Sequence, residues 1–180
     1  KALLKQKKST ESLELQNLIF SYSKDLRQDE LNNDKSEVII NLAQRIIIYT
    51  DFKTGFKFLK DLFANFKGIE FLILDAYINT AIELTNTKKI IYADKLIFES
   101  QKYIKLIKSD SKRDSLYLSF SRLFWRRKES EKSLKYLKLI NDCEERNSAY
   151  CDAAEFYFLN NNLVEFNRVL LSSLDNDSKI

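Results

Sequence analysis

Residues 36–59 read SEVIINLAQRIIIYTDFKTGFKFL, and this stretch decides the fold. Its large apolar residues recur at spacings of three and four, which is the period of an α-helix with one buried face. Two small residues, Ala43 and Gly55, lie on either side of a polar turn that contains Asp51 and Thr54. Small side chains allow two helices to approach closely where they cross. The stretch therefore predicts two antiparallel helices, each with one small residue that suits a close crossing.

The same arrangement recurs three more times along the chain. In each segment the first helix carries a small residue, and in all but the last the second helix faces it with another. The small residues of the first helices are Ala43, Ala81, Ser121 and Ala154, and those of the second helices are Gly55, Ala93 and Ser133. Phe166 occupies the corresponding place in the last segment. The breaks between helices are short, so consecutive helices are predicted to be antiparallel neighbours.

Nine helices are expected from the apolar spacing and from the polar breaks between the segments. A capping-box-like start at Asp34 opens the second, which runs to about Thr50, and the third ends near Asn65 with Gly68 beyond it. The others are expected over about 10–27, 70–86, 89–108, 112–127, 130–142, 146–160 and 163–174.

Composition supports an all-α fold and argues against catalysis. The 180 residues include no proline and two glycines, where average usage gives about nine and a dozen. Phosphate-binding loops need several glycines, and the absence of histidine removes imidazole bases and histidine metal sites. Two cysteines cannot form a structural zinc site by themselves. We therefore expect no enzymatic activity, cofactor or metal, although a carboxylate pair that folding brings together stays an alternative.

The small residues at recurring crossings, together with the large apolar residues around them, resemble the tetratricopeptide repeat. The resemblance covers about residues 36–174 and concerns the pattern. It departs from the family in its alanine or serine at the first crossing position and in its lack of proline. It implies a right-handed α-solenoid of about four helical hairpins preceded by an extra N-terminal helix. The expected domains are an N-terminal helix and linker over residues 1–35 and a repeat domain over 36–180.

The resemblance also implies a function and a place for it. Members of this family bind protein partners in a concave groove that is lined by the first helix of each hairpin. The chain is accordingly expected to be a non-catalytic interaction module, a scaffold, adaptor or chaperone-like subunit, that binds a partner helix or peptide. The predicted partner-binding residues are Gln44, Ile47, Ile78, Ile82, Leu118, Arg122, Trp125, Arg126, Glu155 and Phe158.

Two alternatives concern this groove. Its occupant is either an external partner or the chain's own first helix, whose apolar stripe includes Leu15, Leu18 and Ile19. Trp125 either packs against the next hairpin or anchors the partner, since tryptophan and arginine dominate binding hot spots. The cluster of Arg122, Trp125 and Arg126 is the strongest single candidate for such a hot spot.

Charge and cysteine usage leave further alternatives. The net charge of +4 and the small basic clusters are also compatible with a nucleic-acid-binding helical repeat, which is the second functional hypothesis. Cys143 and Cys151 lie across an expected helix–helix turn, as small, partly buried residues or as a disulfide in an oxidising compartment. No run of apolar residues is long enough to cross a membrane. A cytoplasmic location is the default, and a periplasmic or envelope location stays open, as does membership of a larger complex.

Overall fold

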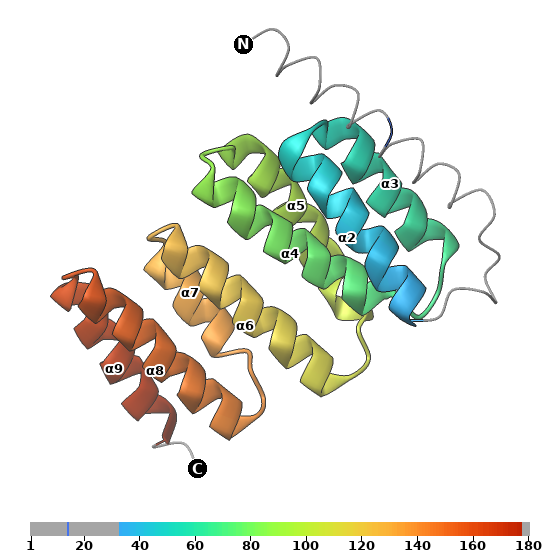
Figure 1. Ribbon diagram of the computed structural model, residues 1–180. Coiled ribbons are helices and arrows are strands. Elements are labelled where there is room, and N and C mark those ends of the chain that lie inside the picture. Colours follow the sequence, from blue (N-terminus) through green and yellow to red (C-terminus); the bar gives the residue numbers. More distant parts are fainter. Residues whose placement is uncertain (1–13, 15–32, 178–180) are drawn as a thin grey trace, which may run out of the picture. The chain divides into compact units, whose positions relative to one another are not determined.

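The computed structural model describes residue 14 and residues 33–177 (Figure 1). Within these residues the regular elements are all helical, which confirms that the fold is all-α, and consecutive helices pack as pairs. The α-helices are α2 (Asn33–Tyr49), α3 (Phe52–Asn65), α4 (Glu70–Asn86), α5 (Ile90–Tyr103), α6 (Asp110–Arg126), α7 (Ser130–Leu137), α8 (Cys143–Leu159) and α9 (Leu163–Asp177). A single 3-10 turn, η1 (Ile104–Leu106), follows α5. The helix predicted over 10–27 lies outside the described residues.

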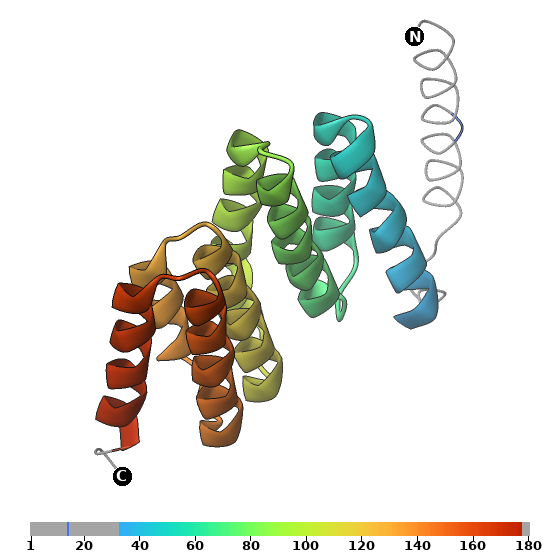
Figure 2. The same ribbon diagram turned by 60° about the vertical axis from the view of Figure 1, so that its left-hand side comes forward.

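The chain forms two compact units, Lys1–Lys102 and Tyr103–Ile180. The described part of the first unit contains α2 to α5, and the second contains α6 to α9 as two further hairpins (Figure 2). The N-terminal segment expected over 1–35 and the repeat domain expected over 36–180 stay predictions.

In the first unit, α2 packs against both α3 and α4. A Cβ atom added to Gly55 would lie 2.8 Å from the Ala43 carbonyl oxygen and 2.7 Å from Ile47 Cγ1. Such distances are too short for carbon, so the predicted crossing of α2 and α3 requires glycine. Aromatic stacking then joins α3 to α5, since the rings of Phe52 and Tyr92 have centroids 4.3 Å apart.

In the second unit, α6 packs against α7, and α8 packs against α9. The serines predicted at the crossing of α6 and α7 meet: Ser121 Oγ and Ser133 Oγ are 2.8 Å apart and hydrogen-bonded, and both side chains are buried. Residues from all four helices share one core. Its buried members are Trp125, Leu134, Leu137, Ile140, Ala149, Tyr150, Ala153, Ala154, Tyr157 and Val169.

Three of the hairpins turn in the same way. Lys88, Lys128 and Asn161 have positive φ angles of 61°, 60° and 54°, and each follows the first helix of its hairpin by two residues. At Lys128 the amide donates to the Trp125 carbonyl over 2.8 Å, and the next amide, of Glu129, donates to Phe124 over 2.9 Å. This pair of hydrogen bonds is a Schellman motif, and it is repeated at Lys88 and Asn161.

The start of α8 corrects the expectation for the cysteines. Asp142 caps this helix by accepting a hydrogen bond from the Glu145 amide over 2.9 Å, so α8 begins at Cys143 and not near residue 146. Cys143 and Cys151 therefore lie on one helix, are both exposed, and are separated by about 12 Å along its axis. A disulfide needs Cα atoms within about 7 Å, so α8 cannot contain a bond between them.

Candidate partner-binding surface

The residues predicted to line a groove in the first unit are partly in its core. Ile47 on α2 and Ile78 on α4 are buried. Gln44 is half-buried, and its Nε2 donates to the Ala76 carbonyl and to Thr80 Oγ1 on α4, each over 3.1 Å. Ile82 is half-buried. Gln44 thus joins α2 to α4, and the role of these four residues in binding stays a prediction.

Trp125 is buried in the second unit, at 6% exposed. Its ring stacks on Phe156 of α8 with centroids 5.9 Å apart. This position agrees with the packing alternative, in which Trp125 contacts the next hairpin. The neighbouring side chains of Arg122 and Arg126 are exposed, so the predicted cluster presents its two cations to solvent and its indole to the core.

The accessible predicted residues of α6 and α8 carry opposite charges. Arg122 pairs with Asp152 of α8 over 3.2 Å, with both side chains about half exposed. Such exposed pairs contribute at most about 1 kcal/mol to stability. Arg126 and Glu155 are exposed, and Leu118 is half-buried against the shared core.

A second surface, on the hairpin of α8 and α9, was not predicted. Phe158, which the sequence did identify, is 56% exposed, and further apolar side chains are exposed beside it in the sequence. They are Leu159, Leu163, Val164, Leu170, Leu171 and Leu174. The sequence of α9 could have indicated this surface, because it contains more large apolar residues than one buried helical face requires. Val169 alone among the described side chains of α9 is buried.

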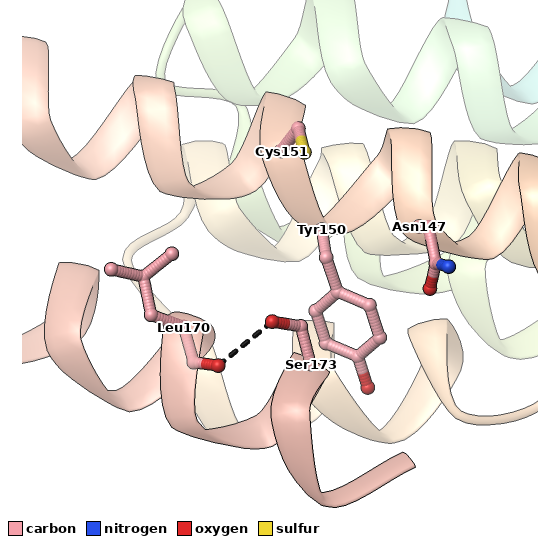
Figure 3. Close-up of a pocket in the computed structure, with 5 residues that line it drawn as sticks. All are labelled: Asn147, Tyr150, Cys151, Leu170 and Ser173. Atoms are coloured by element: carbon pink, nitrogen blue, oxygen red, sulfur yellow. Dashed lines mark hydrogen bonds between the residues drawn. The ribbon is translucent and has the colours of Figure 1, made fainter. Parts of the chain in front are cut away.

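A pocket of about 220 Å³ opens on this hairpin between α8 and α9. Asn147, Tyr150 and Cys151 of α8 line it on one side, and Leu170 and Ser173 of α9 line it on the other (Figure 3). The Ser173 hydroxyl donates to the Leu170 carbonyl over 2.7 Å, so it is engaged within α9. The pocket is therefore mainly apolar, with an amide and a thiol at its edge.

Two titratable groups have clearly raised pKa values. Burial raises the pKa of Asp75 on α4, and a hydrogen bond from Asn79 opposes that effect. Burial also raises the pKa of Tyr157 to about 12, and the negative charge of Glu165 adds to the rise while Arg168 opposes it. Within the described part of the chain, the Tyr157 hydroxyl has no hydrogen-bond partner. Among the described residues, no group of three or more His, Cys, Asp or Glu side chains could hold a metal ion.

Comparison with known proteins gives no relative for this chain. It matches no family model, no curated protein and no solved structure. Among the described helices, none is long and apolar enough to cross a membrane. Inference about function therefore depends on the geometry of the two units.

Proposed function

We propose that the chain is a non-catalytic protein–protein interaction module that binds a helix or peptide of a partner protein. One observation carries this proposal: the hairpin of α8 and α9 exposes Phe158, Leu159, Leu163, Val164, Leu170, Leu171 and Leu174. Contiguous exposed apolar surface is uncommon on monomeric proteins and usually marks an interaction site. A scaffold, an adaptor or a chaperone-like subunit would need such a surface.

We further propose that the hairpins form a tetratricopeptide-like right-handed solenoid. Small residues at three crossings support this, and so do the positive φ angles at Lys88, Lys128 and Asn161. Each of these residues lies seven positions after the crossing residue of its hairpin, which is Ala81, Ser121 or Ala154. Repetition of both the crossing and the turn at the same spacing is typical of a repeat architecture.

The groove of such a solenoid would be lined in the second unit by the predicted residues that are accessible there. Leu118, Arg122, Arg126 and Glu155 are accessible in the second unit, and they would contribute a mixed polar surface. Trp125 would act indirectly, because its contact with Phe156 positions α8 against α6.

The distribution of charge favours a protein partner over nucleic acid. Four of the basic residues in α6 and α7 or between them are engaged with carboxylates: Arg113 with Asp110, Arg122 with Asp152, and Arg127 and Lys132 with Glu129. Nucleic-acid binding depends on cations that are available to neutralise phosphates. These pairings would have to be broken before the four side chains could do so.

Affinity capture tests the proposed function. The full chain is immobilised and exposed to a nuclease-treated lysate of its source organism, and retained proteins are identified by mass spectrometry. We expect a protein that co-purifies with the chain in a defined stoichiometry on light scattering. Retention that occurs only from a parallel lysate without nuclease, and that is lost at about 200 mM salt, would instead support the nucleic-acid alternative.

A further inference from the structure

The hairpins of α2 and α3, of α6 and α7, and of α8 and α9 each have a set of residues at the same positions relative to their crossing residues. In α2 and α3 this set is buried: Ser36, Ile40, Ile47, Leu59 and Leu62. In the hairpin of α6 and α7 the equivalent residues are the buried Asp114, Trp125 and Leu137, the half-buried Leu118, and the buried Ile140, which follows the end of α7. In α8 and α9 they are Asn147, Cys151, Phe158, Leu170 and Ser173, which we call the end surface. Its first four members are exposed, and Ser173 is half-buried.

Burial of the equivalent sets has a direct cause, because a following helix covers each of them. Helix α4 packs on α2, and α8 packs on α6. Four members of the end surface, together with Cys151's neighbour Tyr150, line the 220 Å³ pocket. The fifth, Phe158, is the equivalent of Trp125 and is 56% exposed where Trp125 is 6% exposed. The end surface thus exposes the positions that a following helix covers in the other two sets.

The helix that covers α6 and α7 shows which residues such a surface accepts. Ala149 of α8 is 1% exposed and shares a core with Leu137 and Ile140. Three residues later Asp152 pairs with Arg122, and four residues after that Phe156 stacks on Trp125. A small residue, a charged residue and an aromatic residue at i, i+3 and i+7 therefore lie on one helical face.

The residue equivalent to Arg122 has the opposite charge at the end surface. Gln44 and Arg122 occupy equivalent positions, and each reaches across to the following helix, at Thr80 and Asp152 respectively. Their equivalent on α8 is Glu155, which is exposed and for which the described residues provide no ion pair. A carboxylate at this position favours a cation on a covering helix.

We propose that the end surface docks an amphipathic helix of another protein, with a small residue at i, Lys or Arg at i+3 and an aromatic residue at i+7. The small residue enters the pocket, the cation meets Glu155, and the aromatic ring covers Phe158. This inference rests on the proposed function, because it names the partner of an interaction module. Helix-in-groove recognition of this kind uses anchors at the same spacing.

A second copy of the chain fits the end surface less well. If α2 of another copy covered it, Val38, Asn41 and Arg45 would take the three anchor positions, so the small, the basic and the aromatic residue would all be absent. If two α8 helices paired about a twofold axis, both would bring exposed Glu155 and Glu144 into the interface. Like charges in an interface disfavour association.

A synthetic peptide tests the proposal against the full 180-residue chain. The probe has the sequence of α8, Cys143–Leu159, with Asp152→Arg and with serine at both cysteines. Fluorescence anisotropy should show saturable binding that Phe158→Ala and Leu170→Ala each weaken about tenfold, a typical loss at a binding hot spot. Both residues are exposed, so circular dichroism should be unchanged. Phe98→Ala, at a phenylalanine of α5 that is 66% exposed, is the matched control and should leave binding unchanged.

A charge exchange provides the decisive comparison. The peptide that keeps Asp152 should bind the wild-type chain about fivefold more weakly, and Glu155→Arg should reverse this preference. A preference that persists in Glu155→Arg, or an equal effect of Phe98→Ala, would overturn the proposal. So would self-association that Phe158→Ala abolishes, which would identify a second copy, or binding that appears only in Leu18→Asp, which would identify the chain's own N-terminal segment. A partner captured equally by wild type and Phe158→Ala would retain the proposed function and reject the end surface.

Discussion

Gly55 is the residue at which the packing of α2 against α3 is most sensitive. Alanine is the better helix former by about 1 kcal/mol, but its Cβ would contact the Ala43 carbonyl at 2.8 Å. Because overpacking of this kind costs about 1–3 kcal/mol, we expect Gly55→Ala to lower the free energy of unfolding in urea denaturation by up to about 2 kcal/mol. An increase would mean that the two helices cross at a greater distance.

Tyr157 should make stability depend on alkaline pH. Its pKa is raised to about 12 by burial and by the charge of Glu165, whereas an unfolded tyrosine ionises near 10. Stability from this group is therefore complete below pH 10 and is lost as the pH rises towards 12, with a loss of about 1 kcal/mol by pH 11. Urea denaturation of wild type and Tyr157→Phe between pH 8 and 11 would test this. A difference between them that does not change with pH would contradict it.

At the scale of the element, the three repeated turns each hold a non-glycine residue at a positive φ angle, and glycine would remove the resulting conformational strain. A left-handed conformation costs a non-glycine residue about 1–2 kcal/mol, and asparagine tolerates it better than lysine does. We expect Lys128→Gly to raise the free energy of unfolding by about 1 kcal/mol and Asn161→Gly to raise it less. Thermal denaturation of the two variants would show this order, and the opposite order would mean that the Lys128 side chain has a stabilising contact.

The segment between α7 and α8 is held by one buried carboxylate on α6. Asp114 Oδ2 accepts hydrogen bonds from the amides of Asn141 and Asp142 over 3.0 and 3.1 Å. Asp114→Ala leaves both amides without this acceptor, so we expect a loss of about 1–3 kcal/mol in urea denaturation. Asp114→Asn keeps one acceptor oxygen and should lose less. Equal losses would indicate that the negative charge itself is required.

The bounds of the helices were predictable where the apolar period and a polar break coincide. Helix α4 was expected over 70–86 and spans Glu70–Asn86. The start of α8 was missed because its first turns carry Glu144, Glu145 and Asn147, which resemble a polar loop although they lie on a solvent-facing helix. The end of α7 was misplaced as well: the helix ends at Leu137 before the apolar Leu139 and Ile140, which extend the period without continuing the helix.

At the scale of the whole molecule, the sequence identified the hairpins better than it identified which surfaces stay open. Crossing residues are a local pattern, so the resemblance to the tetratricopeptide repeat was enough to pair Ala43 with Gly55. Exposure depends on what covers a helix: Trp125 and Phe158 occupy equivalent positions, yet one is buried and the other is not. The residue types do not show which of the two a helix covers. The sequence therefore favoured Trp125 as the anchor and did not identify the exposed residues of α9.

Stability should also vary along the second unit, because its helices differ in the number of residues that they bury. Helix α9 has one buried residue among its described side chains, Val169, whereas the shorter α7 has four. Few buried contacts permit local opening, so we expect the amides of α9 to exchange with deuterium faster than those of α7 and α8. Mass spectrometry of the exchanged chain would measure this order.

The same measurement should report occupation of the end surface. Saturating peptide adds apolar contacts to Leu170 and Phe158, so exchange in α9 and in the last turns of α8 should slow at least tenfold. Exchange in α3 should not change, because its core residues Leu59 and Leu62 are already buried. Equal slowing in α3 and α9 would show no local effect at the end surface. That outcome would contradict its assignment as the binding site of the peptide.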